Sequence, residues 1–155
     1  MKKLLFMLVA FPSLLFGCSH SREDLVEYNH SELSAELAEK GIEPKLPTEF
    51  PVAIEGYEIF EPPHKSSRYE TSLTGKNGEI FTLTVHTAPV SYEGNIEKED
   101  VKINGNEGFY TENEVTGPSL HWTEGDYHYI LEYRTIGFDT VVNKETMLDI
   151  AESFE

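Results

Sequence analysis

Several short stretches in the middle of the chain alternate between apolar and polar residues, which is the pattern of half-buried β-strands. The clearest is Ile80–Thr87, where Phe81, Leu83 and Val85 fall on one side and polar residues lie between them. A second alternating run, 69–73, precedes it. This pattern predicts an antiparallel sheet with one apolar face.

Residues 76–78, Lys-Asn-Gly, separate these two runs and predict a hairpin turn. A two-residue loop would place Phe81 opposite Thr74, whereas a three-residue loop with Gly78 in the left-handed conformation would place Phe81 opposite Leu73. A shift of one residue would send the apolar set to the wrong face. We therefore favour the three-residue loop.

Two further turn motifs are flanked by strand-like runs. One is 104–106, Asn-Gly-Asn, and the other is 124–126, Glu-Gly-Asp. Around the second, the residues of one parity are Leu120, Trp122, Tyr127, Tyr129, Leu131 and Tyr133. We interpret this aromatic-rich set as the core face of the sheet. Stacking of these rings against a sugar or a peptide is the alternative.

A helix is predicted ahead of the strands. Leu33 and Leu37 lie one turn apart, and Ser31 is a suitable N-cap. Gly41 ends the helix, because glycine adopts the left-handed conformation of a C-terminal cap readily. The apolar residues of 25–28 allow the helix to extend further toward the N-terminus.

The sequence predicts two further elements, an extended segment and a second helix. Pro44, Pro47 and Pro51 predict an extended segment between the helix and the strands. At the other end of the chain, Asn143 can cap a second helix. The apolar stripe of this helix consists of Met147, Ile150, Ala151 and Phe154.

These elements predict an α+β protein: an antiparallel β-sheet of about six or seven strands, with a C-terminal helix packed on it and a separate N-terminal helix. We expect residues 1–17 to be a cleaved signal peptide and 18–24 a tether. Residues 25–43 are then an N-terminal helical segment, and residues 44–155 form the α+β domain.

The first residues have the organisation of an export signal. Two lysines precede an apolar stretch that ends in Leu15, Phe16, Gly17 and Cys18. This segment resembles the bacterial lipoprotein signal peptide, which has a leucine three positions before an invariant cysteine, although Phe16 is bulkier than the usual residue. The resemblance implies cleavage after Gly17, a diacylglycerol on Cys18 and a location on the outer face of the cell membrane.

Composition narrows the classes of function. The chain has 12 Lys+Arg against 28 Asp+Glu, a formal net charge of −16, so it lacks the basic surface that a nucleic-acid partner needs. Cys18 is the only cysteine, which excludes an internal disulfide framework and a cysteine-rich metal site. We expect no cofactor, and attachment to an anionic membrane through the lipid rather than through surface charge.

Two C-terminal segments carry a second resemblance. Residues 122–131 (Trp-Thr-Glu-Gly-Asp-Tyr-His-Tyr-Ile-Leu) and the helix with Ile150, Ala151 and Ser153 resemble the end of an uncharacterised domain family. Members of that family occur in lipoproteins of spore-forming Gram-positive bacteria and in extracytoplasmic parts of anti-sigma-factor-like proteins. The family has no established activity, so the resemblance implies no functional residues.

His121 and His128 are the most distinctive polar pair. Both fall on the face of the last hairpin opposite to Trp122, either directly or diagonally across the strands. We favour two solvated imidazoles beside Thr123. A weak metal site or a pH-sensing role is the alternative, with Glu132 as the only nearby third ligand.

Other candidate chemistry is sparse. The acidic clusters 97–100 and 112–114 could gather a divalent cation, but such runs are typical of solvated strand ends. No phosphate loop, zinc-protease motif or nucleophile elbow occurs in the sequence. We therefore expect no enzymatic activity and favour a lipid-anchored binding or sensing module at the cell envelope, with an envelope protein as partner. The alternatives are an inhibitor or immunity-type lipoprotein acting on a secreted enzyme and, third, a hydrolase.

Overall fold

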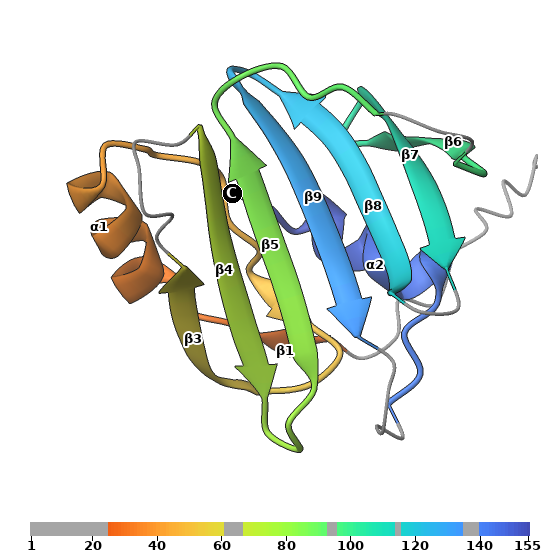
Figure 1. Ribbon diagram of the computed structural model, residues 1–155. Helices are drawn as coiled ribbons and strands as arrows, with labels where there is room; N and C mark the ends of the chain where they lie inside the picture. The colour runs from red at the N-terminus through yellow and green to blue at the C-terminus, as the bar shows by residue number, and fades with distance from the viewer. Residues whose placement is uncertain (1–24, 61–66, 93–95, 114–115, 135–139) are drawn as a thin grey trace, which may run out of the picture.

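The alternating stretches form one seven-stranded antiparallel sheet in the computed structural model, which describes residues 25–60, 67–92, 96–113, 116–134 and 140–155 (Figure 1). The strands are β3 (Ile54–Phe60), β4 (Arg68–Gly75), β5 (Ile80–His86), β6 (Glu99–Ile103), β7 (Asn106–Asn113), β8 (Gly117–Glu124) and β9 (Tyr127–Arg134). Their order across the sheet is β3-β4-β5-β9-β8-β7-β6. Two antiparallel blocks, β3-β4-β5 and β6-β7-β8-β9, are thus joined by the pairing of β5 with β9.

The turn glycines set the register of the hairpins. Leu73 lies opposite Phe81, and Gly78 has a φ of 91°, so the three-residue loop between β4 and β5 is confirmed. Between β6 and β7, Asn104 and Gly105 both have positive φ, which is the signature of a two-residue type I′ turn. Each turn therefore keeps the apolar residues of its two strands on one face.

The apolar face of the sheet is covered by α2 (Lys144–Glu152), which lies behind the sheet in Figure 1. The indole of Trp122 stacks on Tyr129 at 5.0 Å and meets the edge of Phe154 at 5.1 Å. The Asn143 side chain accepts a hydrogen bond from the Thr146 N–H, as predicted for the cap of this helix. The predicted core face of the last hairpin and the α+β class are both confirmed.

The N-terminal helix, α1 (Ser31–Glu39), ends as predicted but begins differently. Gly41 has a φ of 87°, and the Ile42 N–H donates to the Leu37 carbonyl at 3.1 Å, which is a Schellman cap. Ser31 is the first helical residue and not the N-cap, so that prediction is wrong. The side chain of Asn29 accepts from the Ser31 N–H at 3.0 Å and satisfies this amide from outside the helix.

Residues 25–28 do not extend α1, which corrects the second expectation for this region. Val26–Glu27 form the short strand β1, which pairs with β2 (Glu49–Phe50) in a separate two-stranded sheet. The extended, proline-bearing segment presents backbone N–H and C=O groups at Glu49–Phe50. The backbone groups of β1 are satisfied by hydrogen bonds to them. Leu33 and Leu37 of α1 are buried in the same core as the sheet.

No helix in the described ranges is long and apolar enough to cross a membrane.

The extended segment after α1 contacts the other end of the chain. Leu46 and Glu155 exchange two backbone hydrogen bonds, of 3.0 and 3.1 Å. The C-terminus is therefore joined directly to the segment that leads into the sheet.

Glu79 is a buried carboxylate in the β4–β5 turn. It accepts hydrogen bonds from the Asn77 N–H and side-chain amide, both at 3.0 Å, and from the Thr140 hydroxyl at 2.6 Å. Burial opposes its ionisation, but these hydrogen bonds prevail and lower the pKa of Glu79 to about 2. A Cβ on Gly75 would lie 2.6 Å from the carboxylate, so this turn needs glycine beside it.

We expect Trp122→Ala to lower the free energy of unfolding by about 3–5 kcal/mol, because it removes a large aromatic side chain from a packed core. Urea unfolding followed by far-ultraviolet circular dichroism measures the change. Val141, which is 77% exposed, is the control, and Val141→Ala should change the same quantity by less than about 0.5 kcal/mol. Equal losses in the two variants would contradict the burial of Trp122.

Candidate functional site

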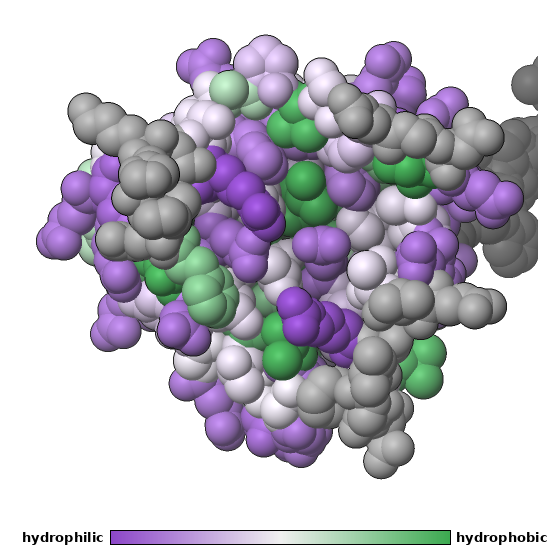
Figure 2. Space-filling model, in the orientation of Figure 1, coloured by the Kyte–Doolittle hydropathy of each residue, from purple (hydrophilic) through white to green (hydrophobic). Residues whose placement is uncertain are grey.

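The face of the sheet opposite α2, called here the outer face, carries the most unusual chemistry of the molecule. Figure 2 shows this face, where hydrophilic and hydrophobic side chains are interspersed. Its centre is shielded from solvent: Thr84 is 1% exposed, Ser119 6% and His121 9%. Polar side chains that are buried need internal hydrogen-bond partners. The partners of Ser119 and His121 define a candidate site.

The hydroxyl of Tyr92 lies between two imidazoles. Its Oη atom is 2.8 Å from Nδ1 of His121 and 2.6 Å from Nε2 of His128. The outer nitrogens are also engaged, since Nε2 of His121 lies 2.7 Å from Oγ of Ser119 and Nδ1 of His128 lies 2.9 Å from Oγ1 of Thr123. These five side chains form one linear chain of hydrogen bonds, called here the Tyr92 network.

The strand register explains how the histidines come together. Thr123 of β8 lies opposite His128 of β9, and His121 lies opposite Ile130, so the two histidines are diagonal neighbours on one face. The segment after β5 brings in the third member. Residues 87–92 run from the end of β5 across the start of β9 toward β8 (Figure 1), and Tyr92 thereby lies over both rings.

Aromatic packing fixes the orientation of His121. Its ring stacks on Phe109, the residue opposite it in β7, with centroids 4.4 Å apart and planes 7° apart. Tyr92 meets Phe109 edge to face at 5.1 Å. The ammonium of Lys98 lies 4.4 Å from the ring of Tyr92 and 4.3 Å from that of Phe109, a double cation–π contact.

The hydrogen bonds of the network can all form with neutral side chains. A neutral imidazole offers one donor and one acceptor, and each hydroxyl can donate once. Ser119 can therefore donate to His121, His121 to Tyr92, Tyr92 to His128, and His128 to Thr123. The reversed order satisfies the same four contacts.

The surroundings favour the uncharged forms. Burial, together with His128 and Lys98, lowers the pKa of His121 to about 4. Burial and the neighbouring His86 lower the pKa of His128, and burial raises the pKa of Tyr92 to about 12. At neutral pH the network is thus a chain of uncharged groups that is buried at the Ser119–His121 end and reaches solvent at Thr123.

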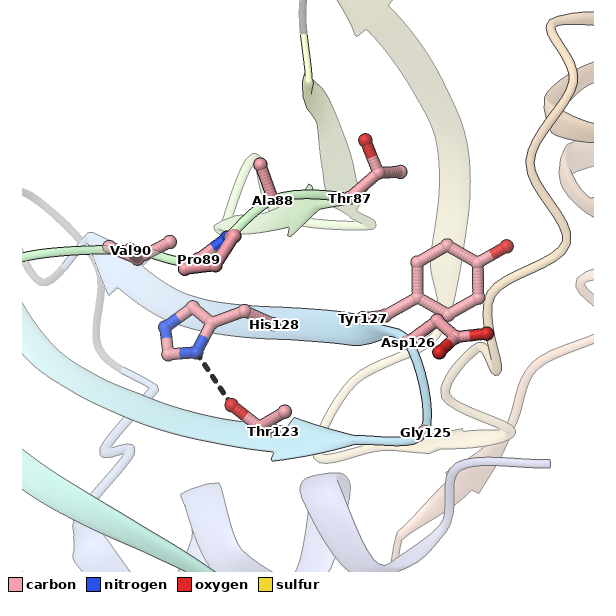
Figure 3. Close-up of a pocket in the computed structure, with 9 residues that line it drawn as sticks. All are labelled: Thr87, Ala88, Pro89, Val90, Thr123, Gly125, Asp126, Tyr127 and His128. Carbon is pink, nitrogen blue, oxygen red and sulfur yellow. Dashed lines mark hydrogen bonds between the residues drawn. The ribbon is translucent and has the colours of Figure 1, made fainter.

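One end of the network opens into a hollow of about 400 Å³ (Figure 3). One wall is formed by Thr87–Val90, and the other by the β8–β9 turn. The lining side chains of the second wall are Thr123, Asp126, Tyr127 and His128. Its size lies within the range of about 300–1,000 Å³ that is typical of small-ligand sites.

The sequence placed His121 and His128 on one face, and the structure confirms this with the diagonal arrangement. The expectation that both imidazoles are solvated is wrong for His121, because Phe109 and Tyr92 cover it. Sequence reasoning missed Tyr92 and Ser119 altogether. Tyr92 follows a segment without alternation, so the sequence offered no signal of its position.

The described residues supply no third ligand for a metal ion held by His121 and His128. Glu132 shares the face, but it lies opposite Ser119 and Thr82, and burial followed by Glu70 raises its pKa. No group of three or more histidine, cysteine, aspartate or glutamate side chains that could hold a metal occurs within the described ranges.

The other candidate residues from the sequence form surface contacts with neighbouring side chains or lie outside the described residues. In the acidic cluster 97–100, Glu99 is paired with Lys144, and in the cluster 112–114, Glu112 accepts a hydrogen bond from Tyr110 at 2.9 Å. Glu114 lies outside the described residues. So do Leu15, Phe16, Gly17 and the lipid-attachment candidate Cys18.

No protein-family model, curated protein or solved structure matches this chain. The resemblances to a lipoprotein signal and to an uncharacterised domain family therefore stay predictions.

We expect Tyr92→Phe to lower the free energy of unfolding by about 1–3 kcal/mol, because it leaves one ring nitrogen of the buried His121 and one of the half-buried His128 without a partner. Chemical unfolding at pH 7 measures the loss. Tyr127→Phe is the matched control, since its hydroxyl makes one exposed hydrogen bond, to the Glu43 N–H. The network assignment would be wrong if Tyr92→Phe were no more destabilising than Tyr127→Phe.

Proposed function

We propose that this protein is a lipid-anchored extracytoplasmic module that binds or senses a partner at the cell envelope without catalysing a reaction. We further propose that the hollow beside His128 is its binding surface. The observation that carries this proposal is the junction of the hollow with the Tyr92 network. His128 and Thr123 belong to both, so hydrogen bonds hold the polar wall of the hollow in place.

The position of the hollow suits a protein tethered at its N-terminal end. β1 pairs with β2, and Phe50 of β2 contacts Phe81 at the start of β5, at 5.0 Å. The hollow lies beyond the other end of β5, roughly 20 Å further along the strand. Residues 19–24 would extend over about 20 Å at most. The hollow therefore lies at the opposite end of β5 from the two-stranded sheet that follows the tether.

The charge of the chain agrees with a partner other than the membrane surface. A formal net charge of −16 repels anionic lipids, so a lipid on Cys18 must supply the attachment. The hollow itself carries Asp126 and an imidazole with a lowered pKa, and no lysine or arginine lines it. These features favour an envelope protein or peptide with neutral or basic groups.

The network does not favour an enzyme. Ser119 and His121 lie 2.7 Å apart, which is the contact of a nucleophile with its base. Ser119, however, is 6% exposed, and the residues that line the hollow include His128 and Thr123 instead. A substrate in the hollow would meet the opposite end of the network from the serine.

One observation supports the second candidate, an inhibitor or immunity-type lipoprotein. The β8–β9 turn exposes Gly125 and Asp126, and the residue on each side of this pair contacts the segment 43–45. Glu124 pairs with Lys45 at 2.7 Å, and the Tyr127 hydroxyl accepts from the Glu43 N–H at 3.0 Å. A rigid protruding turn is suited to insertion into the cleft of another protein.

We expect Cys18→Ala to abolish lipid attachment, so that the precursor stays uncleaved or the domain is released from the membrane. Fractionation of expressing cells and mass measurement of the product test this. Recovery of the variant in the membrane fraction at the size of the processed wild-type chain would refute the anchor.

We expect a photo-crosslinking amino acid at Ala88 or at Asp126, on the two walls of the hollow, to capture the same envelope protein in intact cells. The same amino acid at Glu145, exposed on α2, is the control and should not capture that protein. Products are identified by mass spectrometry. Capture from Glu145 as well, or different proteins from the two walls, would place the binding surface elsewhere.

A further inference from the structure

Residues 87–92 are attached to the sheet at both ends, and one of the two attachments involves groups that can take up protons. At the first end, the Thr87 N–H donates to the Ser67 carbonyl at 2.8 Å. At the other end, Tyr92 is held by His121 and His128 through its hydroxyl. Ala88 and Pro89, between these ends, are exposed and form a wall of the hollow.

We propose that the Tyr92 network is a proton-operated latch, which holds residues 87–92 and the wall of the hollow against the sheet at neutral pH and releases them in acid. The release moves only this segment and leaves the core of the sheet folded. Its effect on ligand binding rests on the proposed function of the hollow, whereas the latch itself does not.

The count of protons explains the release. A first added proton can be accommodated, because His121 can then donate to both Ser119 and Tyr92 while Tyr92 still donates to His128. A second added proton cannot. Both imidazoles then direct N–H groups at the Tyr92 oxygen, the Tyr92 hydroxyl loses its acceptor, and two positive charges face each other across one oxygen atom.

Charged side chains on several neighbouring strands also influence proton uptake by His121 and His128. Lys98 lies over Tyr92, Arg68 of β4 lies opposite His86, and His86 of β5, which becomes positive only on protonation, contacts His128 edge to face at 6.2 Å. The acidic groups on this face include Glu70 of β4 opposite Thr84, Asp100 of β6 opposite Phe109, Glu132 of β9 opposite Ser119, and Asp126, which lines the hollow together with His128. In the closed arrangement both ring nitrogens of each histidine are hydrogen-bonded to hydroxyl groups and not to these carboxyls.

The direction of the pH dependence follows from the two imidazoles. In the closed arrangement burial lowers the pKa of His121 to about 4 and also lowers that of His128. Once the segment has moved away, both rings are solvated and titrate near 6.5. The closed arrangement is therefore fully favoured above about pH 6.5. Below it, each imidazole shifts the ratio of closed to open molecules toward open by up to about tenfold per pH unit, until its own closed-state pKa is reached.

Hydroxyl-radical footprinting with mass spectrometry tests the latch on the full chain without any ligand, by measuring oxidation of individual tyrosine side chains at pH 7 and pH 5. We expect Tyr92, which is half-buried, to be partly protected at pH 7 and to approach the reactivity of an exposed tyrosine at pH 5. Tyr133 is fully buried in the core and should stay protected at both pH values. A Tyr92 reactivity that is the same at both pH values would overturn the proposal, as would a parallel rise at Tyr133.

The double variant His121→Gln/His128→Gln separates protonation of these rings from other effects of acid, because glutamine can hydrogen-bond but does not titrate in this range. We expect the reactivity of Tyr92 in this variant to be independent of pH between 5 and 7. His30→Gln, at the start of α1, is the matched control and should keep the wild-type response. A pH response that persists in the double variant would show that other groups operate the opening and would overturn the latch. Failure of the latch would leave the crosslinking test of the hollow unaffected.

Discussion

The pairing of β5 with β9 is the interaction on which the rest of the structure depends. It joins the two blocks of the sheet, and its register decides what lies on each face. On the core side it sets Phe81 against Tyr133 and Leu83 against Leu131, and all four side chains are buried. On the outer side it places His86 opposite His128, where the hollow begins. A single register thus produces both the hydrophobic core and the candidate site.

Local signals were sufficient to predict most of the elements. The hairpin at Gly78 and the cap of α2 by Asn143 depend on residues close in sequence, whose backbone preferences and hydrogen bonds act within a few positions. The helix extension over 25–28 failed for the opposite reason. Those residues pair with Glu49–Phe50, and a partner more than twenty positions away overrides a short apolar pattern.

The candidate site was predictable only in part. Strand parity placed His121 and His128 on one face, because parity is a property of each strand alone. It could not reveal that Tyr92, from a segment without regular structure, covers them. A solvated face and a partly buried polar network have the same alternating sequence, and the difference between them lies in whether a connecting segment covers the strands.

The separation of β5 from β9 along the chain also bears on how an exported chain would fold. β3, β4 and β5 can form a meander as soon as they emerge, but one edge of β5 has no partner until residues 127–134 have followed. An unpaired edge rich in β-branched and aromatic residues is prone to aggregate. Completion of the sheet therefore waits for its last strand. Under the proposed lipid anchor at Cys18, each newly exported chain would be held at the membrane, apart from its neighbours, during that interval.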